Sequence, residues 1–295
     1  MAPPAMAFAD HRGGWPGSFD TAASGLGKTY IDRHALFLTG GDTFGYDASI
    51  GIRRYLLAAR LAKASGVGVM PSIMGTNIYD VEFGNVAGAD FVGLGFRACR
   101  DASTRPVREG TVGAGTGGTV GPLLERKGLL GTKGGIGSAA GRVGPWTVGS
   151  LFVTNCVGNV FDPFEGRTIA GTHRRRGGFF EMDDMLEEYA ANANARGGTT
   201  VGIVGTDAPL DHEQLARLVE LAHDGIVMAV RPAHMAADGD TILGFRTAGR
   251  RADRVGHRAF DALHHVAVRE VARAIVRSVR AATSLGGVRS FTDPG

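Results

Sequence analysis

The amino-acid sequence predicts an α/β fold in which sheets and helices are stacked in layers. Short apolar runs, typical of buried strands, alternate along the chain with segments whose apolar residues recur at helical spacing. The 47 glycines among 295 residues are scattered between these runs, where they indicate tight turns and close backbone approaches. The sequence has no internal repeat, so the alternation favours layers that share a common core.

Each element is predicted from the spacing of its apolar residues. Short apolar runs predict strands at residues 35–38, 67–70, 78–83, 148–153, 158–161, 199–204, 226–230 and 241–246. Helical spacing predicts helices at residues 50–61, 182–191, 211–222 and 259–282. Asp211 is expected to cap the third helix, whereas residues 89–100 are ambiguous because two glycines weaken a helix and interrupt a strand. Residues 1–30 lack periodicity, so order is expected to begin near His34.

Composition bounds the class of protein. A net charge of +3 is weak evidence for an anionic partner. Cys99 and Cys156 lie far apart in the sequence and suggest neither a disulfide framework nor a zinc site. No run reaches the roughly 18 apolar residues of a membrane span. We therefore expect a cytoplasmic protein that uses no cofactor or metal and binds neither nucleic acid nor membrane.

Two glycine-rich motifs fail as nucleotide sites. Gly25 to Thr29 ends like a phosphate-binding loop, but Ala22 stands where the first glycine is needed. Gly113, Gly115 and Gly118 have the dinucleotide spacing but are not followed by a clear helix. Tight backbone packing is the better explanation of the second motif.

Thr199 is a candidate nucleophile because it opens an apolar run directly after two glycines. A threonine hydroxyl needs a base beside it. When threonine is the first residue of a chain, its own α-amino group, with a pKa near about 7.7–8.0, supplies that base. The hydroxyl would first have to attack the Gly198 carbonyl, and glycine permits the unusual turn this needs. The alternative is an ordinary turn before a strand.

Asp238 and Asp240 form a candidate carboxylate pair. Residues two apart in extended structure project to the same face, so both side chains could reach one site. Two close carboxylates raise the pKa of one of them, which leaves one acceptor and one proton carrier. A polar hairpin turn or part of a calcium loop is the alternative.

Asn155 and Lys133 are two further candidates. Asn155 lies at an expected bend between the paired runs 148–153 and 158–161, where its amide could face a developing oxyanion. Lys133 is surrounded by glycines that would let it donate hydrogen bonds inside a cleft. A turn asparagine and a surface lysine are the alternatives.

These residues stand in segments that resemble a known family. The region from Gly198 to Asp240 resembles the nucleophile and paired-aspartate region of the endo-type 6-aminohexanoate-oligomer hydrolases, the nylon hydrolases, which belong with the DmpA-type aminopeptidases. Further matching segments, in the family's order, are residues 38–41 with 44–46, 112–117, 133–137 and 153–158. The resemblance covers roughly residues 36 to 285.

The resemblance implies a self-processing enzyme with a four-layer α/β/β/α sandwich of the N-terminal-nucleophile-hydrolase type. Residues 1–198 and 199–295 would be two fragments of one catalytic domain, separated by cleavage between Gly198 and Thr199. Gly198 departs from the nylon hydrolases, which have asparagine there, and agrees with the aminopeptidase branch. The family also suggests a homo-oligomer, a tetramer or larger.

Carried over residue by residue, the resemblance makes Thr199 the nucleophile. Asp238 and Asp240 would orient and tune it, while Lys133 and Asn155 would line the pocket, Asn155 as the oxyanion donor.

Phe44 and Tyr46 are the substrate-binding residues that the resemblance implies. Phe44 stands where the nylon hydrolases have a tyrosine, so Tyr46 would have to make any hydroxyl contact. The implied reaction is hydrolysis of linear amides such as 6-aminohexanoate oligomers through an acyl-enzyme. An aminopeptidase acting on short peptides or β-amino-acid amides and a catalytically silent binding or scaffold relative are the alternatives.

Overall fold

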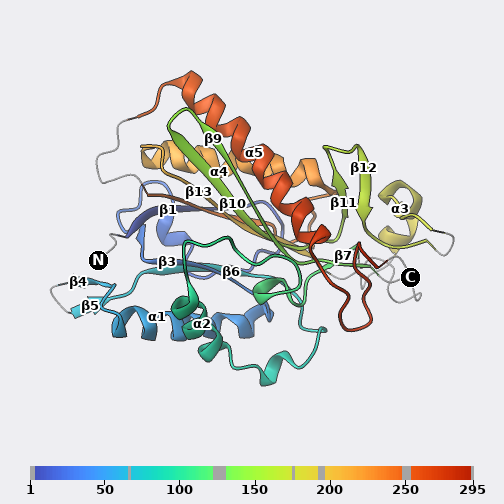
Figure 1. The fold of residues 1–295 in the computed structure, drawn as a ribbon, viewed down its shortest axis with the longest axis horizontal. Coiled ribbons are helices and arrows are strands. Elements are labelled where there is room, and N and C mark those ends of the chain that lie inside the picture. Colours follow the sequence, from blue (N-terminus) through green and yellow to red (C-terminus); the bar gives the residue numbers. More distant parts are fainter. Residues whose placement is uncertain are drawn as a thin grey trace.

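The computed structural model describes residues 4–65, 68–121, 131–174, 177–191, 197–247 and 254–293. Within these ranges, a helix pair, a large sheet, a small sheet and a second helix pair are stacked in four layers (Figure 1). This order confirms the α/β/β/α sandwich.

The large sheet is six-stranded, with the order β2-β1-β15-β13-β10-β9. Its strands are β1 (Ala5–His11), β2 (Asp32–Arg33), β9 (Ile136–Val143), β10 (Trp146–Asn155), β13 (Thr199–Thr206) and β15 (Thr241–Arg246). β13 and β15 run parallel, whereas the other neighbouring pairs are antiparallel. Because parallel strands begin at the same edge of a sheet, Thr199 and the aspartates just before Thr241 lie at one edge.

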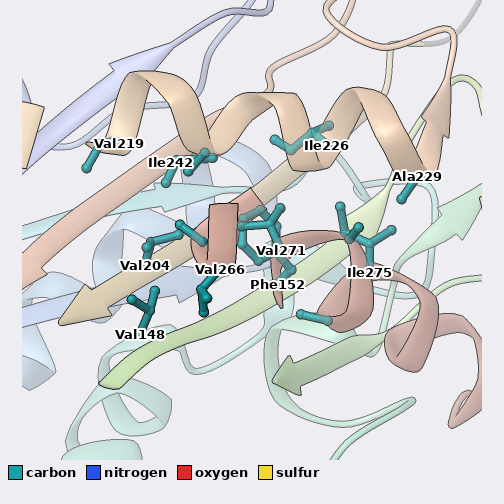
Figure 2. Packing of buried hydrophobic residues seen from close by; sticks show 14 of the residues in the cluster. Val148, Phe152, Val204, Val219, Ile226, Ala229, Ile242, Val266, Val271 and Ile275 are labelled. Carbon is teal, nitrogen blue, oxygen red and sulfur yellow. The ribbon is translucent and has the colours of Figure 1, made fainter. Parts of the chain in front are cut away.

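Two helices cover one face of this sheet: α4 (His212–Ala229) and α5 (His257–Arg280) (Figure 1). Alternate strand residues point to this face, and Phe152 and Val204 pack there against Ile226 and Ile275 in the main apolar core (Figure 2). The opposite residues of β10 and β13, which include Asn155 and Thr199, therefore face the small sheet.

The small sheet and the second helix pair form the other two layers. The sheet pairs β3 (Ala35–Thr39) with β6 (Ile73–Asn77) in parallel, and the helices are α1 (Ala48–Ala58) and α2 (Phe91–Asp101). Phe37 and Ile73 pack against Ile52 of α1. Met74 packs instead against Leu243 of the large sheet, so the alternation of β6 joins the two sheets.

Smaller elements surround the layers. They are β4 (Lys63–Ser65), β5 (Gly68–Met70), β7 (Thr119–Val120), β8 (Thr132–Lys133), β11 (Asn159–Asp162), β12 (Arg167–Ala170), β14 (Val230–Arg231) and α3 (Met182–Ala191). β12, β11 and β14 form a three-stranded sheet, while β4 with β5 and β7 with β8 form two-stranded ones. In the described part of the chain, no helix is long and apolar enough to cross a membrane.

Several elements match their predicted bounds. β15 and α3 coincide with the predicted strand and helix at residues 241–246 and 182–191. α4 starts after Asp211, whose carboxylate accepts the N–H of Gln214 at 2.8 Å. Most of the ambiguous segment 89–100 is helical, as part of α2, which Asp90 caps by accepting the N–H of Gly93 at 2.7 Å.

The prediction for the N-terminal residues was wrong. Residues 5–11 form β1, which lies inside the large sheet between β2 and β15 rather than in an irregular lead-in. Its register with β15 pairs Met6 with Arg246 and His11 with Thr241. These partners lie more than 200 positions along the chain, so local periodicity carried no sign of them.

Two strand predictions and one predicted pairing were also wrong. Residues 226–229 continue α4, because Ile226 and Ala229 extend its buried face. The second strand of the small sheet occupies residues 73–77 rather than 78–83. The runs at 148–153 and 158–161 are strands but belong to different sheets, so they do not pair. Val67, at the start of another predicted strand, lies outside the described residues.

Candidate active site

Thr199 is buried at the first position of β13, with 4% of its surface exposed. Its hydroxyl donates to the carbonyl oxygen of Gly198 at 2.6 Å. The same oxygen, Oγ1, accepts the backbone N–H of Tyr79 at 3.4 Å from the small-sheet side. The hydroxyl thus lies against the peptide bond that precedes it.

The Gly198 peptide is held by the loop that carries the aspartates. Its N–H donates to the carbonyl of Ala237 at 3.2 Å, and its carbonyl accepts the N–H of Gly239 at 3.0 Å. A Cβ at position 198 would lie 2.3 Å from the backbone nitrogen of Val157. Only glycine fits there without displacing backbone, which gives a physical reason for the departure from asparagine.

Asp240 is fully buried, and its carboxylate accepts three hydrogen bonds. Its Oδ1 accepts the N–H of Thr200 at 2.8 Å, and its Oδ2 accepts the backbone N–H of His234 at 2.9 Å and the ring Nδ1 at 2.8 Å. Three donors favour the ionised carboxylate. Asp240 thereby ties the residue after Thr199 to the loop before β15.

Asp238 is also fully buried but accepts fewer hydrogen bonds than Asp240 does. Its Oδ2 accepts the N–H of Met235 at 3.2 Å. Burial, and then the charge of Asp240, raise the pKa of Asp238 to about 7. The two aspartates therefore hold one proton between them near neutral pH, as their spacing in the sequence suggested.

The peptide between the aspartates touches the candidate nucleophile. A Cβ on Gly239 would lie 3.0 Å from Cγ2 of Thr199 and 3.3 Å from its Oγ1. The same Cβ would lie 2.9 Å from the carbonyl oxygen of Trp15, so glycine fits here without displacing its neighbours. The carboxylate pair and Thr199 are thus joined through backbone.

Asn155 ends β10 directly opposite Thr199 in the register of the large sheet, so it is a strand residue rather than a bend residue. Its Nδ2 donates to the carbonyl of Tyr79 at 2.8 Å, and its Oδ1 accepts the N–H of Thr119 at 2.9 Å. Asn155 therefore holds the backbone of Tyr79, the residue whose N–H reaches Thr199. Its role as oxyanion donor stays a prediction.

Lys133 is fully buried, which excludes a surface lysine. Its Nζ donates to the carbonyls of Gly118 at 2.6 Å, Gly134 at 3.0 Å and Gly115 at 3.3 Å. Burial lowers the pKa of Lys133 to about 8, with the charge of Asp80 opposing the shift. Lys133 is therefore still mostly protonated at pH 7, as its three hydrogen bonds to carbonyls require.

Comparison with known protein families assigns this chain. The family model described as peptidase family S58 matches residues 1–292. The chain belongs to peptidase family S58. The S58 membership agrees with the resemblance to the nylon hydrolases and DmpA-type aminopeptidases.

Relatives within this family hydrolyse amide bonds according to their names. An uncharacterized aminopeptidase of Mycobacterium tuberculosis is 32% identical over 256 residues, covering 84% of this chain and 72% of that protein. A 6-aminohexanoate-oligomer endohydrolase of Paenarthrobacter ureafaciens is 27% identical over 230 residues, covering 76% of this chain and 63% of that protein. This S58 chain is thus an amide hydrolase.

Solved structures support the fold. A β-aminopeptidase of Burkholderia sp. superposes with a TM-score of 0.68 at 22% identity, covering 99% of this chain and 79% of that one. The L-aminopeptidase D-Ala-esterase/amidase of Ochrobactrum anthropi, described as a variant of the Ntn hydrolase fold, gives a TM-score of 0.65 at 19% identity, covering 97% and 76%. The S58 chain shares this fold.

The two predicted substrate residues, Phe44 and Tyr46, lie outside the group of described residues that contact Thr199. Phe44 is half exposed in the short 3₁₀ helix Asp42–Asp47. Tyr46 is half-buried 5.9 Å from the Phe19 ring, and its hydroxyl bonds to Asn77, at the end of β6. The structure describes no contact from either side chain to Thr199, so their substrate roles stay predictions.

Three contributors to this S58 site were missed in the sequence. The backbone of Tyr79 joins Thr199 to Asn155 through its N–H and its carbonyl, and Asp80 beside it accepts the N–H of Gly41 at 2.5 Å. His234 donates to Asp240. Tyr79 and Asp80 fell inside a wrongly predicted strand, and a lone histidine in a loop has no distinguishing pattern.

Proposed function

We propose that the chain cuts its own bond between Gly198 and Thr199, and that the freed Thr199 is the nucleophile of an amide hydrolase. The observation that carries the proposal is the 2.6 Å contact between Oγ1 of Thr199 and the carbonyl oxygen of Gly198. Residues 1–198 and 199–295 would then remain together as two fragments of one domain.

Self-cleavage would follow from this geometry. Oγ1 of Thr199 adds to the Gly198 carbonyl carbon, while the Gly239 N–H, 3.0 Å from the carbonyl oxygen, stabilises the negative charge that develops there. The carbon–nitrogen bond breaks, the nitrogen of Thr199 takes up the hydroxyl proton, and an ester forms. Water hydrolyses the ester, leaving a Gly198 carboxylate and a free Thr199 amine.

Substrate hydrolysis would repeat the same chemistry. The free amine, with a pKa near about 7.7–8.0, takes the proton from Oγ1 as the hydroxyl attacks a substrate amide. The Tyr79 N–H, which lies 3.4 Å from Oγ1, and the Asn155 amide, which now donates to the Tyr79 carbonyl, are the proposed donors for the oxyanion. An acyl-enzyme on Thr199 forms, the substrate amine leaves, and water releases the acid.

Linear amides such as 6-aminohexanoate oligomers are one proposed substrate class. Short peptides or β-amino-acid amides are the other, favoured by the higher identity to a mycobacterial aminopeptidase, 32% against 27% for a nylon-oligomer hydrolase. Parallel assays with aminoacyl p-nitroanilides and 6-aminohexanoate oligomers separate them.

The mass of the purified protein tests the cleavage. Wild type is expected to give two fragments that meet between Gly198 and Thr199, and Thr199→Ala a single full-length, inactive chain. Thr200→Ala is the matched control, because the Thr200 hydroxyl is buried without a hydrogen bond in the described structure. It is expected to cleave normally. A wild type that is active yet uncut contradicts the mechanism.

We also propose, from the family resemblance, a cytoplasmic homo-oligomer of four or more chains. Light scattering of the cleaved protein measures this state directly, and a monomer contradicts it.

A further inference from the structure

His234 occupies an unusual position behind the carboxylate pair. It follows β14 in the loop that leads to Asp238, and its backbone has φ +60°, a left-handed conformation uncommon for residues other than glycine. This conformation directs both its backbone N–H and its ring Nδ1 to Oδ2 of Asp240, at 2.9 and 2.8 Å. The side chain is only 20% exposed.

The ring can donate to Asp240 in only one neutral form. Nε2 of His234 is buried and has no hydrogen-bond partner within the described structure. A hydrogen on Nε2 would therefore be buried without an acceptor, which is unfavourable. The hydrogen belongs on Nδ1, where Asp240 accepts it.

His223 of α4 lies behind His234 and keeps it in place. The two rings are 5.0 Å apart, edge to face, and His223 is 3% exposed. Nε2 of His223 lies 3.4 Å from the backbone carbonyl of Asp10 and 3.6 Å from its carboxylate. Burial, and then His234, lower the pKa of His223 to about 4, so this second ring is neutral at pH 7.

The charged groups around His234 come from three elements. Asp238 and Asp240 precede β15, His223 comes from α4, and Asp10 belongs to β1, where it pairs with Arg12. Asp10 and Arg12 neutralise each other. The carboxylate pair therefore dominates the electrostatics on the side of His234 that faces Thr199.

We propose that His234 is a positioning residue, whose Nδ1–H holds Asp240 ionised and thereby keeps the proton shared by the two carboxylates on Asp238. Ionised Asp240 in turn accepts the N–H of Thr200 at 2.8 Å and fixes the start of β13, where Thr199 lies. The inference rests on the proposed function of Thr199.

Three substitutions separate a hydrogen-bond role from a packing role. His234→Asn keeps an N–H near the place of Nδ1, and asparagine tolerates the left-handed backbone. His234→Gly tolerates the backbone but removes the donor. His234→Ala also removes the donor and adds no charge, and it serves in place of His234→Gly if that variant does not fold.

The first measurement is the pH dependence of kcat/KM on an aminoacyl p-nitroanilide. Without the donor, ionised Asp240 is less stable, so the pair keeps its protons to higher pH. Loss of a hydrogen bond to a charged group is expected to move the acidic midpoint up by about one pH unit or more in His234→Gly. His234→Asn is expected to move the midpoint less than His234→Gly, because it keeps the donor. Unchanged midpoints in folded donor-free variants overturn the proposal.

The second measurement does not need activity. In the uncut Thr199→Ala chain, urea unfolding from pH 4 to 9 reports the protons held by the pair. Above about pH 6.5, where His223 no longer titrates, stability is expected to fall with rising pH, and this fall should extend about one unit higher in His234→Gly than in His234→Asn. Identical profiles overturn the role of His234, whereas an uncut, inactive wild type overturns only the function of Thr199.

Discussion

The pH dependence of folding stability tests the site, because the folded structure raises the pKa of Asp238 and lowers the pKa of His223. Between its ordinary pKa of 3.8 and its folded value of about 7, Asp238 binds a proton in the folded state only. Its contribution to stability is complete below pH 4 and is lost as the pH rises to 7. At about 1.4 kcal/mol for each pH unit, this loss amounts to about 4 kcal/mol.

His223 acts in the opposite direction. Its pKa is lowered from 6.5 to about 4, so between these values the unfolded chain binds a proton that the folded chain does not. Stability attributable to His223 therefore rises with pH across this window by about 3 kcal/mol. The contributions of His223 and Asp238 largely cancel, and a nearly level profile is expected between pH 4 and 6.5.

Substitution should expose each contribution separately. The assay is urea unfolding followed by circular dichroism between pH 4 and 7.5, in the Thr199→Ala chain so that cleavage plays no part. Asp238→Asn is expected to make stability rise by about 3 kcal/mol from pH 4 to 6.5, and His223→Gln to make it fall by a similar amount. The double variant should return to a level profile.

Parallel curves for all four chains would refute this reasoning. They would mean that Asp238 and His223 titrate alike in the folded and unfolded states, so that neither is buried as the structure has it. A slope of the wrong sign in either single variant would refute the assignment for that residue.

Three further predictions concern the neighbouring residues. Gly198→Ala is expected to lower the unfolding free energy by about 1–3 kcal/mol, because the added Cβ would clash with backbone atoms. Gly149→Ala is the control, because its Cβ would point into open space. Equal effects of the two substitutions in urea unfolding would contradict the clash. Lys133→Met is expected to lower the unfolding free energy by about 3 kcal/mol or more, because it leaves three carbonyls without a donor. Lys28→Met, at an exposed position, is the control and should lower it by less than about 0.5 kcal/mol. Similar melting temperatures of the two variants would argue against a buried ammonium. Asp240→Asn should cost about 2–3 kcal/mol and abolish cleavage, and fragments of wild-type mass would show that the ionised carboxylate is dispensable.

Local pattern was sufficient where an element shows its own periodicity. The strand at 241–246 and the helix at 182–191 were predicted with their observed bounds, and the cap at Asp211 was predicted from its residue type. Local pattern was insufficient where pairing between residues far apart in the sequence determines whether a strand forms. Residues 5–11 have no clear alternation, yet they form a strand inside the large sheet because β15 pairs with them.

The site divides in the same way. Thr199 and the two aspartates could be singled out because a hydroxyl after two glycines and carboxylates two apart are visible in the sequence. The Tyr79 peptide and the His234 ring could not, because their importance is that the fold brings a backbone N–H to Oγ1 at 3.4 Å and an imidazole to Asp240 at 2.8 Å.

The sequence alone thus determined the alternation of strands and helices, the candidate nucleophile and, through several short motifs in one order, the family. Tertiary structure decided which strand edges meet and which charges are buried together. The parallel pairing of β13 with β15 brings Thr199 beside the loop of Asp238 and Asp240. Burial there raises the pKa of Asp238 to about 7. Both effects depend on neighbours that are distant along the chain, so they exist only once the chain is folded.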